Sequence, residues 1–125
     1  MNLPASFIDY TRALLGNEEY EKFAVALQQD PPVSIRINNR KWMMNHDDYS
    51  LKKVLWASEG YYLDERLTFT FDPLFHAGCY YVQEASSMFV EQILRQYAKE
   101  PVIMLDLCAA PGGKSTHLRS ILPEG

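Results

Sequence analysis

The chain has 125 residues, of which 47% are hydrophobic and 22% charged, and its formal net charge is −4. This length and composition predict an ordinary globular domain and exclude an intrinsically disordered chain. The longest apolar runs are too short to cross a bilayer, and the negative charge excludes strong binding of nucleic acid by overall charge alone. Binding to nucleic acid would therefore need a local basic patch or basic surface supplied elsewhere.

The cysteines and histidines indicate neither secretion nor a metal site. The residues after Met1 do not form a basic segment followed by an apolar one, so we expect no secretory signal peptide. Cys79 and Cys108 predict no disulfide framework and no four-ligand metal site. We therefore expect a reducing, cytoplasmic setting. The three histidines have no metal-like spacing and are predicted to be structural or exposed; they are His46, His76 and His117.

The first 32 residues predict a helical hairpin. Residues 4–15 start with a proline and place apolar residues three and four apart, which gives a helix with one apolar face. Gly16 suits the end of this helix, and Asn17 suits the cap of a second one. Two glutamates follow where the helix dipole favours acids, and Asp30-Pro31-Pro32 ends the second helix.

Residues 33–38 alternate apolar and polar side chains, which predicts a half-buried strand. Arg36 lies on the polar face of this strand. It is either a contact to an RNA phosphate or a cofactor, or a solvated arginine in a surface pair. We favour the solvated arginine, because surface ion pairs usually contribute little.

The middle of the chain predicts short elements. Asp47 or Asp48 caps a helix that runs through Leu55, and residues 61–63 and 67–71 read as strands. Asp72-Pro73 is a turn. Trp56 is predicted to pack in the core or at its rim rather than to stack on a base.

A strand at residues 79–82 and a helix at about residues 86–99 follow. Gln83 and Glu84 lie between them. We give equal weight to two interpretations, helix capping by Glu84, Ser86 or Ser87, and a role that faces the substrate.

Residues 102–122 predict a strand, a tight turn and a helix. Residues 102–107 are apolar enough for a strand buried on both faces, and the helix covers residues 114–122. The turn between them contains Pro111, Gly112 and Gly113. Glycines let a ligand approach the backbone, and the first amides of the helix suit an anion or a carboxylate. We therefore predict a ligand at residues 108–113.

Two ligands compete for this turn. Residues 108–115 read C-A-A-P-G-G-K-S, which fits the phosphate-binding P-loop pattern except that Cys108 replaces its first glycine. A nucleotide hydrolase is therefore one reading. The other is a methyltransferase turn that holds the methionine part of S-adenosylmethionine, and it also uses Asp106 at the end of the strand.

Three strings resemble the Nop/Sun family of RNA cytosine-5 methyltransferases. They are D-L-C-A-A-P-G-G-K at residues 106–114, Y-V-Q-E-A-S-S-M at 81–88 and P-V-S-I-R-I-N at 32–38. The resemblance implies an α+β N-terminal, RNA-binding domain at residues 1–77. Residues 78–125 would then begin an α/β Rossmann-like, S-adenosylmethionine-dependent methyltransferase domain, with its first strand and helix and no more.

The resemblance also implies the chemistry. Members transfer a methyl group from S-adenosylmethionine to carbon 5 of a cytosine in RNA, with ribosomal RNA the expected substrate here. Asp106 would orient the turn or the amino group of the methionine. The cofactor would be held by Cys108, Ala109, Ala110, Pro111, Gly112, Gly113 and Lys114.

The catalytic cysteine of the family lies in a later motif, so neither Cys79 nor Cys108 is expected to be the nucleophile. The chain by itself is then predicted to be inactive. A noncatalytic RNA-binding module remains a further alternative.

Overall fold

The computed structural model describes residues 3–42 and 51–123. The chain divides into two compact units, Met1–Pro31 and Pro32–Gly125. The second unit is a small α+β fold built on a four-stranded antiparallel sheet. None of the helices in the described ranges is long and apolar enough to cross a membrane.

The first unit is the predicted helical hairpin, with α1 at Ala5–Leu15 and α2 at Asn17–Ala26. Gly16 separates the helices with a φ of 79°, a conformation that a glycine adopts without strain. Asn17 is the first residue of α2 rather than its cap, and Gly16 takes the cap position. The rings of Phe7 and Phe23, 6.3 Å apart, join the two helices.

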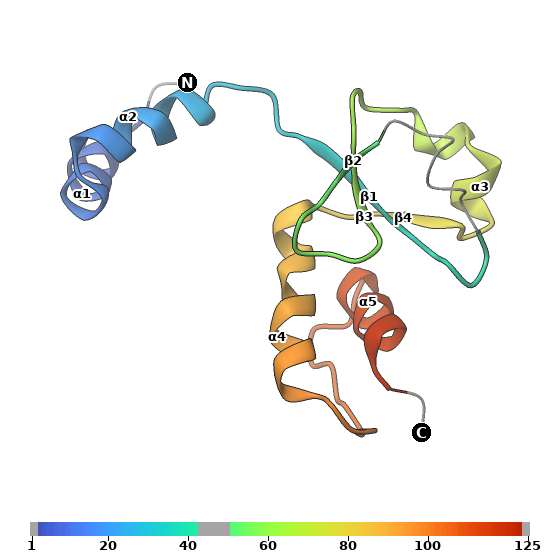
Figure 1. Cartoon of the computed structure of the whole chain (residues 1–125). Coiled ribbons are helices and arrows are strands. Elements are labelled where there is room, and N and C mark those ends of the chain that lie inside the picture. Colours follow the sequence, from blue (N-terminus) through green and yellow to red (C-terminus); the bar gives the residue numbers. More distant parts are fainter. Residues whose placement is uncertain (1–2, 43–50, 124–125) are drawn as a thin grey trace. The chain divides into compact units, whose positions relative to one another are not determined.

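The sheet of the second unit has the order β2-β3-β1-β4. Figure 1 shows α3 at one side of this sheet and α4 and α5 at the other. Its strands are β1 at Val33–Ile37, β2 at Lys52–Lys53, β3 at Gly60–Leu63 and β4 at Tyr80–Val82. Ile35 lies opposite Tyr61 of β3 and Val82 of β4, so β1 is a central strand. This confirms the strands predicted near residues 33, 61 and 79.

The core lies on both faces of β1. Ile35 and Ile37 pack with aromatic residues on one face, in a cluster formed by Ile35, Ile37, Tyr61, Phe69 and Tyr80. A second cluster contains Val54, Ala57, Ala85 and Met88. Trp56 packs against this second cluster and donates from Nε1 to the Ala85 carbonyl oxygen at 2.6 Å, which confirms its predicted packing role.

Two predictions for the middle of the chain are wrong. Lys52–Lys53 forms strand β2 where the end of a helix was predicted, because its backbone pairs with β3; residues 47–50 of that helix lie outside the described residues. Phe69–Phe71 is the 3₁₀ helix η1 rather than a strand. Phe69 turns into the core against Phe75 and Tyr80, and a short helix α3 follows at Pro73–His76.

The helices after the sheet follow the prediction closely. The 3₁₀ helix η2 at Ala85–Phe89 leads into α4 at Val90–Tyr97, and α5 covers Gly113–Ile121. Helices α4 and α5 pack against each other (Figure 1).

The strand predicted at residues 102–107 does not form in this structure. Ile103, Leu105 and Leu107 are 105%, 80% and 86% exposed, and no described residue pairs with this segment as a strand neighbour. A strand needs a neighbour for its backbone hydrogen bonds. Among the described residues, residues 102–107 are therefore an exposed apolar segment without strand pairing, and this segment leads into the turn before α5.

Candidate functional site

The turn that leads into α5 is held by Asp106. Its Oδ1 accepts from the Cys108 amide at 2.9 Å, and its Oδ2 accepts from the Ser115 hydroxyl at 2.5 Å. These hydrogen bonds, that of Ser115 first, hold the pKa of Asp106 below its ordinary value. Both ends of the turn are thereby tied to one carboxylate, so Asp106 orients the turn, which is one of its two predicted roles.

Both glycines of the turn occupy positions that disfavour a side chain. Gly112 has a φ of 106°, in the left-handed region. A Cβ on Gly113 would meet Cε1 of Tyr81 at 3.1 Å. The Tyr81 hydroxyl also donates to the Pro111 carbonyl oxygen at 3.4 Å. Tyr81 lies in β4, the strand next to β1. It therefore supports the turn by packing against Gly113 and bonding to Pro111.

The other predicted cofactor residues lie at the surface. Cys108, Ala109, Ala110, Pro111 and Lys114 are exposed. Helix α5 begins at Gly113. Within the described residues, no side chain caps the first amides of α5, and Lys114 beside them is exposed.

Arg36 is not the solvated surface arginine that we favoured. It is only 5% exposed, because η2 packs against β1 and Thr116 of α5 lies within hydrogen-bond distance of its guanidinium. Its Nε donates to Oε1 of Gln83 at 3.0 Å, and Nη2 donates to Oγ1 of Thr116 at 2.7 Å. Burial lowers the pKa of its guanidinium. Arg36 therefore ties the central strand to the first turn of α5.

Gln83 and Glu84 have different roles in the structure. Gln83 is buried; it accepts from Arg36 and donates to the Ser87 hydroxyl at 3.3 Å. The Ser87 hydroxyl donates to the Glu84 carbonyl oxygen, while the Glu84 side chain is exposed and makes no capping hydrogen bond to η2. Of the three capping candidates, Ser87 is therefore the one whose side chain forms a hydrogen bond with the residue before η2.

A buried cluster around Glu91 was not predicted. Glu91 of α4 accepts from Nε2 of His117 at 2.9 Å, from Nε of Arg95 at 2.8 Å and from the Ser58 amide at 3.1 Å. The spacing of Glu91 and Arg95 was the one available signal, since residues four apart on a helix are neighbours. His117 is buried and structural and His76 is exposed, both as predicted, while His46 lies outside the described residues.

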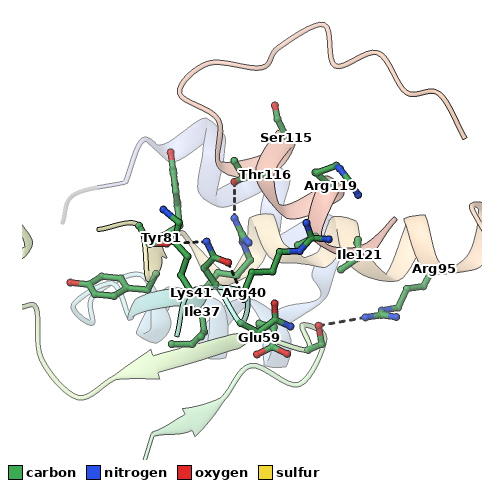
Figure 2. A pocket seen from close by; sticks show the side chains of 17 residues that line it. Ile37, Arg40, Lys41, Glu59, Tyr81, Arg95, Ser115, Thr116, Arg119 and Ile121 are labelled. Atoms are coloured by element: carbon green, nitrogen blue, oxygen red, sulfur yellow. Dashed lines mark hydrogen bonds between the residues drawn. The ribbon is translucent and has the colours of Figure 1, made fainter. Parts of the chain in front are cut away.

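A groove of about 670 Å³ opens beside the turn (Figure 2). One wall is the end of β1 and the residues after it, and the other wall is formed by residues 115–121 of α5. Figure 2 shows Thr116 and Arg119 above, and Ile37, Arg40 and Glu59 below. Its charged lining residues are Arg36, Arg40, Lys41, Glu59, Arg95 and Arg119.

Metal ligands are not gathered anywhere in the part of the chain that the structure describes. No group of three or more His, Cys, Asp or Glu side chains there could hold a metal ion.

Comparison with known proteins identifies the family. The model of the N-terminal domain of 16S rRNA methyltransferase RsmF matches residues 3–85. The chain is 30% identical over 131 residues to the ribosomal RNA small subunit methyltransferase F of Serratia proteamaculans, an alignment that covers 96% of this chain and 27% of that protein. The corresponding protein of Pectobacterium atrosepticum is 32% identical over 133 residues, which cover 97% of this chain and 28% of that protein.

A solved structure has the same fold. The crystal structure of a methyltransferase homologue from Pyrococcus horikoshii matches with a TM-score of 0.65 and 30% identity, over 96% of this chain and 45% of that chain. The chain spans about a quarter of the length of the Serratia and Pectobacterium methyltransferases named above. These matches confirm the Nop/Sun resemblance, and the chain belongs to the family defined by the N-terminal domain of 16S rRNA methyltransferase RsmF.

Proposed function

We propose that this chain is the N-terminal part of an S-adenosylmethionine-dependent enzyme that methylates carbon 5 of a cytosine in ribosomal RNA. The names of its relatives support a ribosomal RNA methyltransferase of the small subunit. Carbon 5 and the cofactor follow from the residues that resemble the Nop/Sun family. Such a substrate is consistent with the cytoplasmic setting expected from the sequence.

The geometry of the turn is the observation that carries this proposal. Asp106 fixes its two ends, Gly112 allows its left-handed bend, and α5 begins there without a side-chain cap. Uncapped helix amides beside an exposed Lys114 fit a carboxylate. We therefore assign the carboxylate of the methionine part of S-adenosylmethionine to the amides near Gly112 and Gly113. The whole cofactor turn that holds the cofactor comprises Cys108, Ala109, Ala110, Pro111, Gly112, Gly113 and Lys114. When bound there, the cofactor supplies an electrophilic methyl group.

The exposed segment at residues 102–107 fits the start of a Rossmann-like sheet. Its apolar side chains and its position before the turn are those of a buried parallel strand. We propose that residues 1–77 form the accessory domain and that residues 78–125 begin the catalytic domain. The neighbours of this strand would then come from residues that this chain does not contain.

Neither cysteine of the chain fits the family's nucleophile. Cys79 is buried in the sheet region, and Cys108 is part of the proposed cofactor turn. Attack on carbon 6 of cytosine needs an activated thiolate that faces the base. We therefore expect the nucleophile elsewhere in the full-length protein, and no methyl transfer by residues 1–125 alone.

Calorimetry of the full-length protein tests the proposal. We expect heat on titration of S-adenosylmethionine and none on titration of ATP with Mg²⁺. The Gly112→Ala variant should weaken cofactor binding, because alanine is strained at a φ of 106°. Gly16→Ala is the matched control, since Gly16 also has a positive φ but lies in the first compact unit. Heat with ATP only would favour the P-loop reading and overturn the proposal.

A noncatalytic RNA-binding module is the second candidate, favoured by the cationic groove beside α5. It predicts RNA binding with no response to S-adenosylmethionine. Labelled cofactor incubated with small-subunit ribosomal RNA separates the two, because only the methyltransferase transfers the label.

A further inference from the structure

We propose that the groove between the end of β1 and α5 binds the phosphodiester backbone of the RNA substrate and leads one strand past the cofactor turn. This inference rests on the proposed function, because it names where the substrate of that function lies.

The charge of the groove differs from that of the chain. The whole chain carries a formal charge of −4, yet the groove presents five basic side chains and one acidic side chain, Glu59. Arg95 is paired with Glu91, and Arg36 is buried. Lys41 and Arg119 are exposed and outnumber Glu59, so the described lining stays positive without counting Arg40. A locally positive groove on an acidic protein concentrates polyanions such as RNA at one place.

The cations lie on opposite walls. Arg40 and Lys41 follow β1, and Arg119 projects from α5 (Figure 2). Lys41 Nζ donates to the Ala77 carbonyl oxygen at 2.8 Å, which leaves two of its three ammonium hydrogens for a ligand. Arg119 makes no hydrogen bond or ion pair with the described residues. Cations on both sides suit a chain of phosphates that runs through the groove rather than a single anion.

The wall at β1 is fixed before any ligand binds. Asn38 Nδ2 donates to the Gly78 carbonyl oxygen at 3.0 Å, and Asn38 Oδ1 accepts from the Arg40 amide at 3.2 Å. The Lys41 amide donates to the Asn38 carbonyl oxygen at 2.9 Å. This turn therefore holds its two basic residues in place, which reduces the entropy lost on binding.

The groove also reaches the cofactor turn. Ser115 and Thr116 line it, and Ser115 donates to Asp106, which holds that turn. Ser115 lies two residues after Gly113, about 3 Å along the helix axis. An RNA strand in the groove would therefore pass next to the site assigned to the methyl donor. The hydroxyl hydrogens of Ser115, Thr116 and Ser120 are already donated to Asp106, Gly112 and His117. Their oxygens add acceptors for the hydroxyl groups of ribose.

Binding of a fluorescein-labelled single-stranded RNA oligonucleotide tests this inference. Fluorescence anisotropy is measured with residues 1–125 across a series of salt concentrations, after circular dichroism has shown that each variant is folded. We expect Arg119→Ala and Lys41→Ala each to weaken binding about 3- to 10-fold and to reduce the salt slope by about 0.7.

Two control variants remove the same charges outside the groove. Arg66 and Lys52 are exposed and do not line it, so Arg66→Ala and Lys52→Ala should change the affinity less than about twofold. If the controls lose as much affinity as the groove variants, or the unmodified chain does not bind RNA, the inference is wrong.

The two proposals fail separately. If full-length Arg119→Ala binds S-adenosylmethionine normally and also keeps its RNA affinity, the groove assignment fails and the methyltransferase stands. If groove variants lose RNA while the unmodified protein does not bind the cofactor, the methyltransferase fails and the groove stands.

Discussion

Glu91 of α4 and His117 of α5 form a hydrogen bond of 2.9 Å in which both residues are 1% exposed. Within the described residues, Nδ1 of His117 has no partner. A neutral imidazole whose Nε2 carries the hydrogen fits this site, because Nδ1 is then an acceptor without a proton. A second proton would place an unpaired donor in the interior. The pair therefore stabilises the fold with His117 neutral and Glu91 charged.

Stability should fall in mild acid because of this histidine. Burial lowers the pKa of His117 from its ordinary value of 6.5, although the hydrogen bond to Glu91 partly opposes the shift. The unfolded state then binds more protons than the folded state below about pH 6.5, so the free energy of unfolding decreases as the pH falls. Urea unfolding at pH 7.5 and pH 5.5 measures the decrease.

His117→Gln is the informative variant for this pH effect, because its amide can still donate to Glu91 but does not titrate. We expect a smaller loss of stability between pH 7.5 and pH 5.5 than in the unmodified chain. The control variant His76→Gln removes an exposed imidazole. It should lose as much stability between pH 7.5 and pH 5.5 as the unmodified chain does. Equal pH dependence in the His117→Gln variant and the unmodified chain would show that His117 is not responsible.

Removal of the Glu91 carboxylate should destabilise the fold strongly. Glu91→Ala leaves His117, the Ser58 amide and Arg95 without their shared acceptor. We expect a loss of about 3 kcal/mol in the free energy of unfolding. Glu65→Ala, at an exposed position, should change it by less than about 0.5 kcal/mol. A similar effect of the two substitutions would mean that the cluster contributes little.

Arg36 should be irreplaceable by lysine. Its guanidinium donates to Gln83 and Thr116 from two different nitrogens, which a single ammonium cannot reproduce. We expect Arg36→Lys to cost about 1–3 kcal/mol of stability. Thr116→Val should lower the free energy of unfolding by less in the Arg36→Lys variant than in the unmodified chain, because the two residues share one interaction. Fully additive effects in this double-mutant cycle would contradict the tie between β1 and α5.

Gly60 should tolerate no side chain. A Cβ there would lie 2.7 Å from Sδ of Met88, 2.9 Å from Cβ of Ala57 and 3.0 Å from Cβ of Val54. The methionine end can move, but the two Cβ atoms cannot, so Gly60→Ala should cost about 1–3 kcal/mol. Ala57→Gly in the same chain should recover part of this loss, since it removes one of the fixed contacts. No recovery would indicate that backbone strain, rather than overpacking, is the cause.

Local patterns in the sequence were sufficient for the regular elements. The alternation at residues 33–38 and the helical spacing in α1, α2, α4 and α5 predicted the right type of secondary structure. They did not predict burial: β1 is buried on both faces, and Tyr10 and Leu14 of the apolar face of α1 are 71% and 69% exposed. The predictions failed where distant residues decide. Lys52–Lys53 is a strand only because β3 lies beside it, and Phe69 leaves the extended conformation to pack against Phe75 and Tyr80.

In the candidate site, too, local features were predicted and contacts between distant residues were not. The string at residues 106–114 indicates a ligand-binding turn, because its glycines and its acid act locally. The contacts of Tyr81 with Gly113 and of Arg36 with Thr116 join residues far apart in the sequence. No periodicity marks such contacts, and an arginine that alternates with apolar residues looks solvated until α5 is placed over it.

The exposed apolar segment before the turn makes a sensitive reporter. Its backbone amides at residues 102–107 have no strand neighbour among the described residues, so in residues 1–125 they should exchange with deuterium as fast as those of an unstructured peptide. Any polypeptide that docks along this edge would slow that exchange. A single mass-spectrometric peptide from this region therefore distinguishes a completed sheet from an open one.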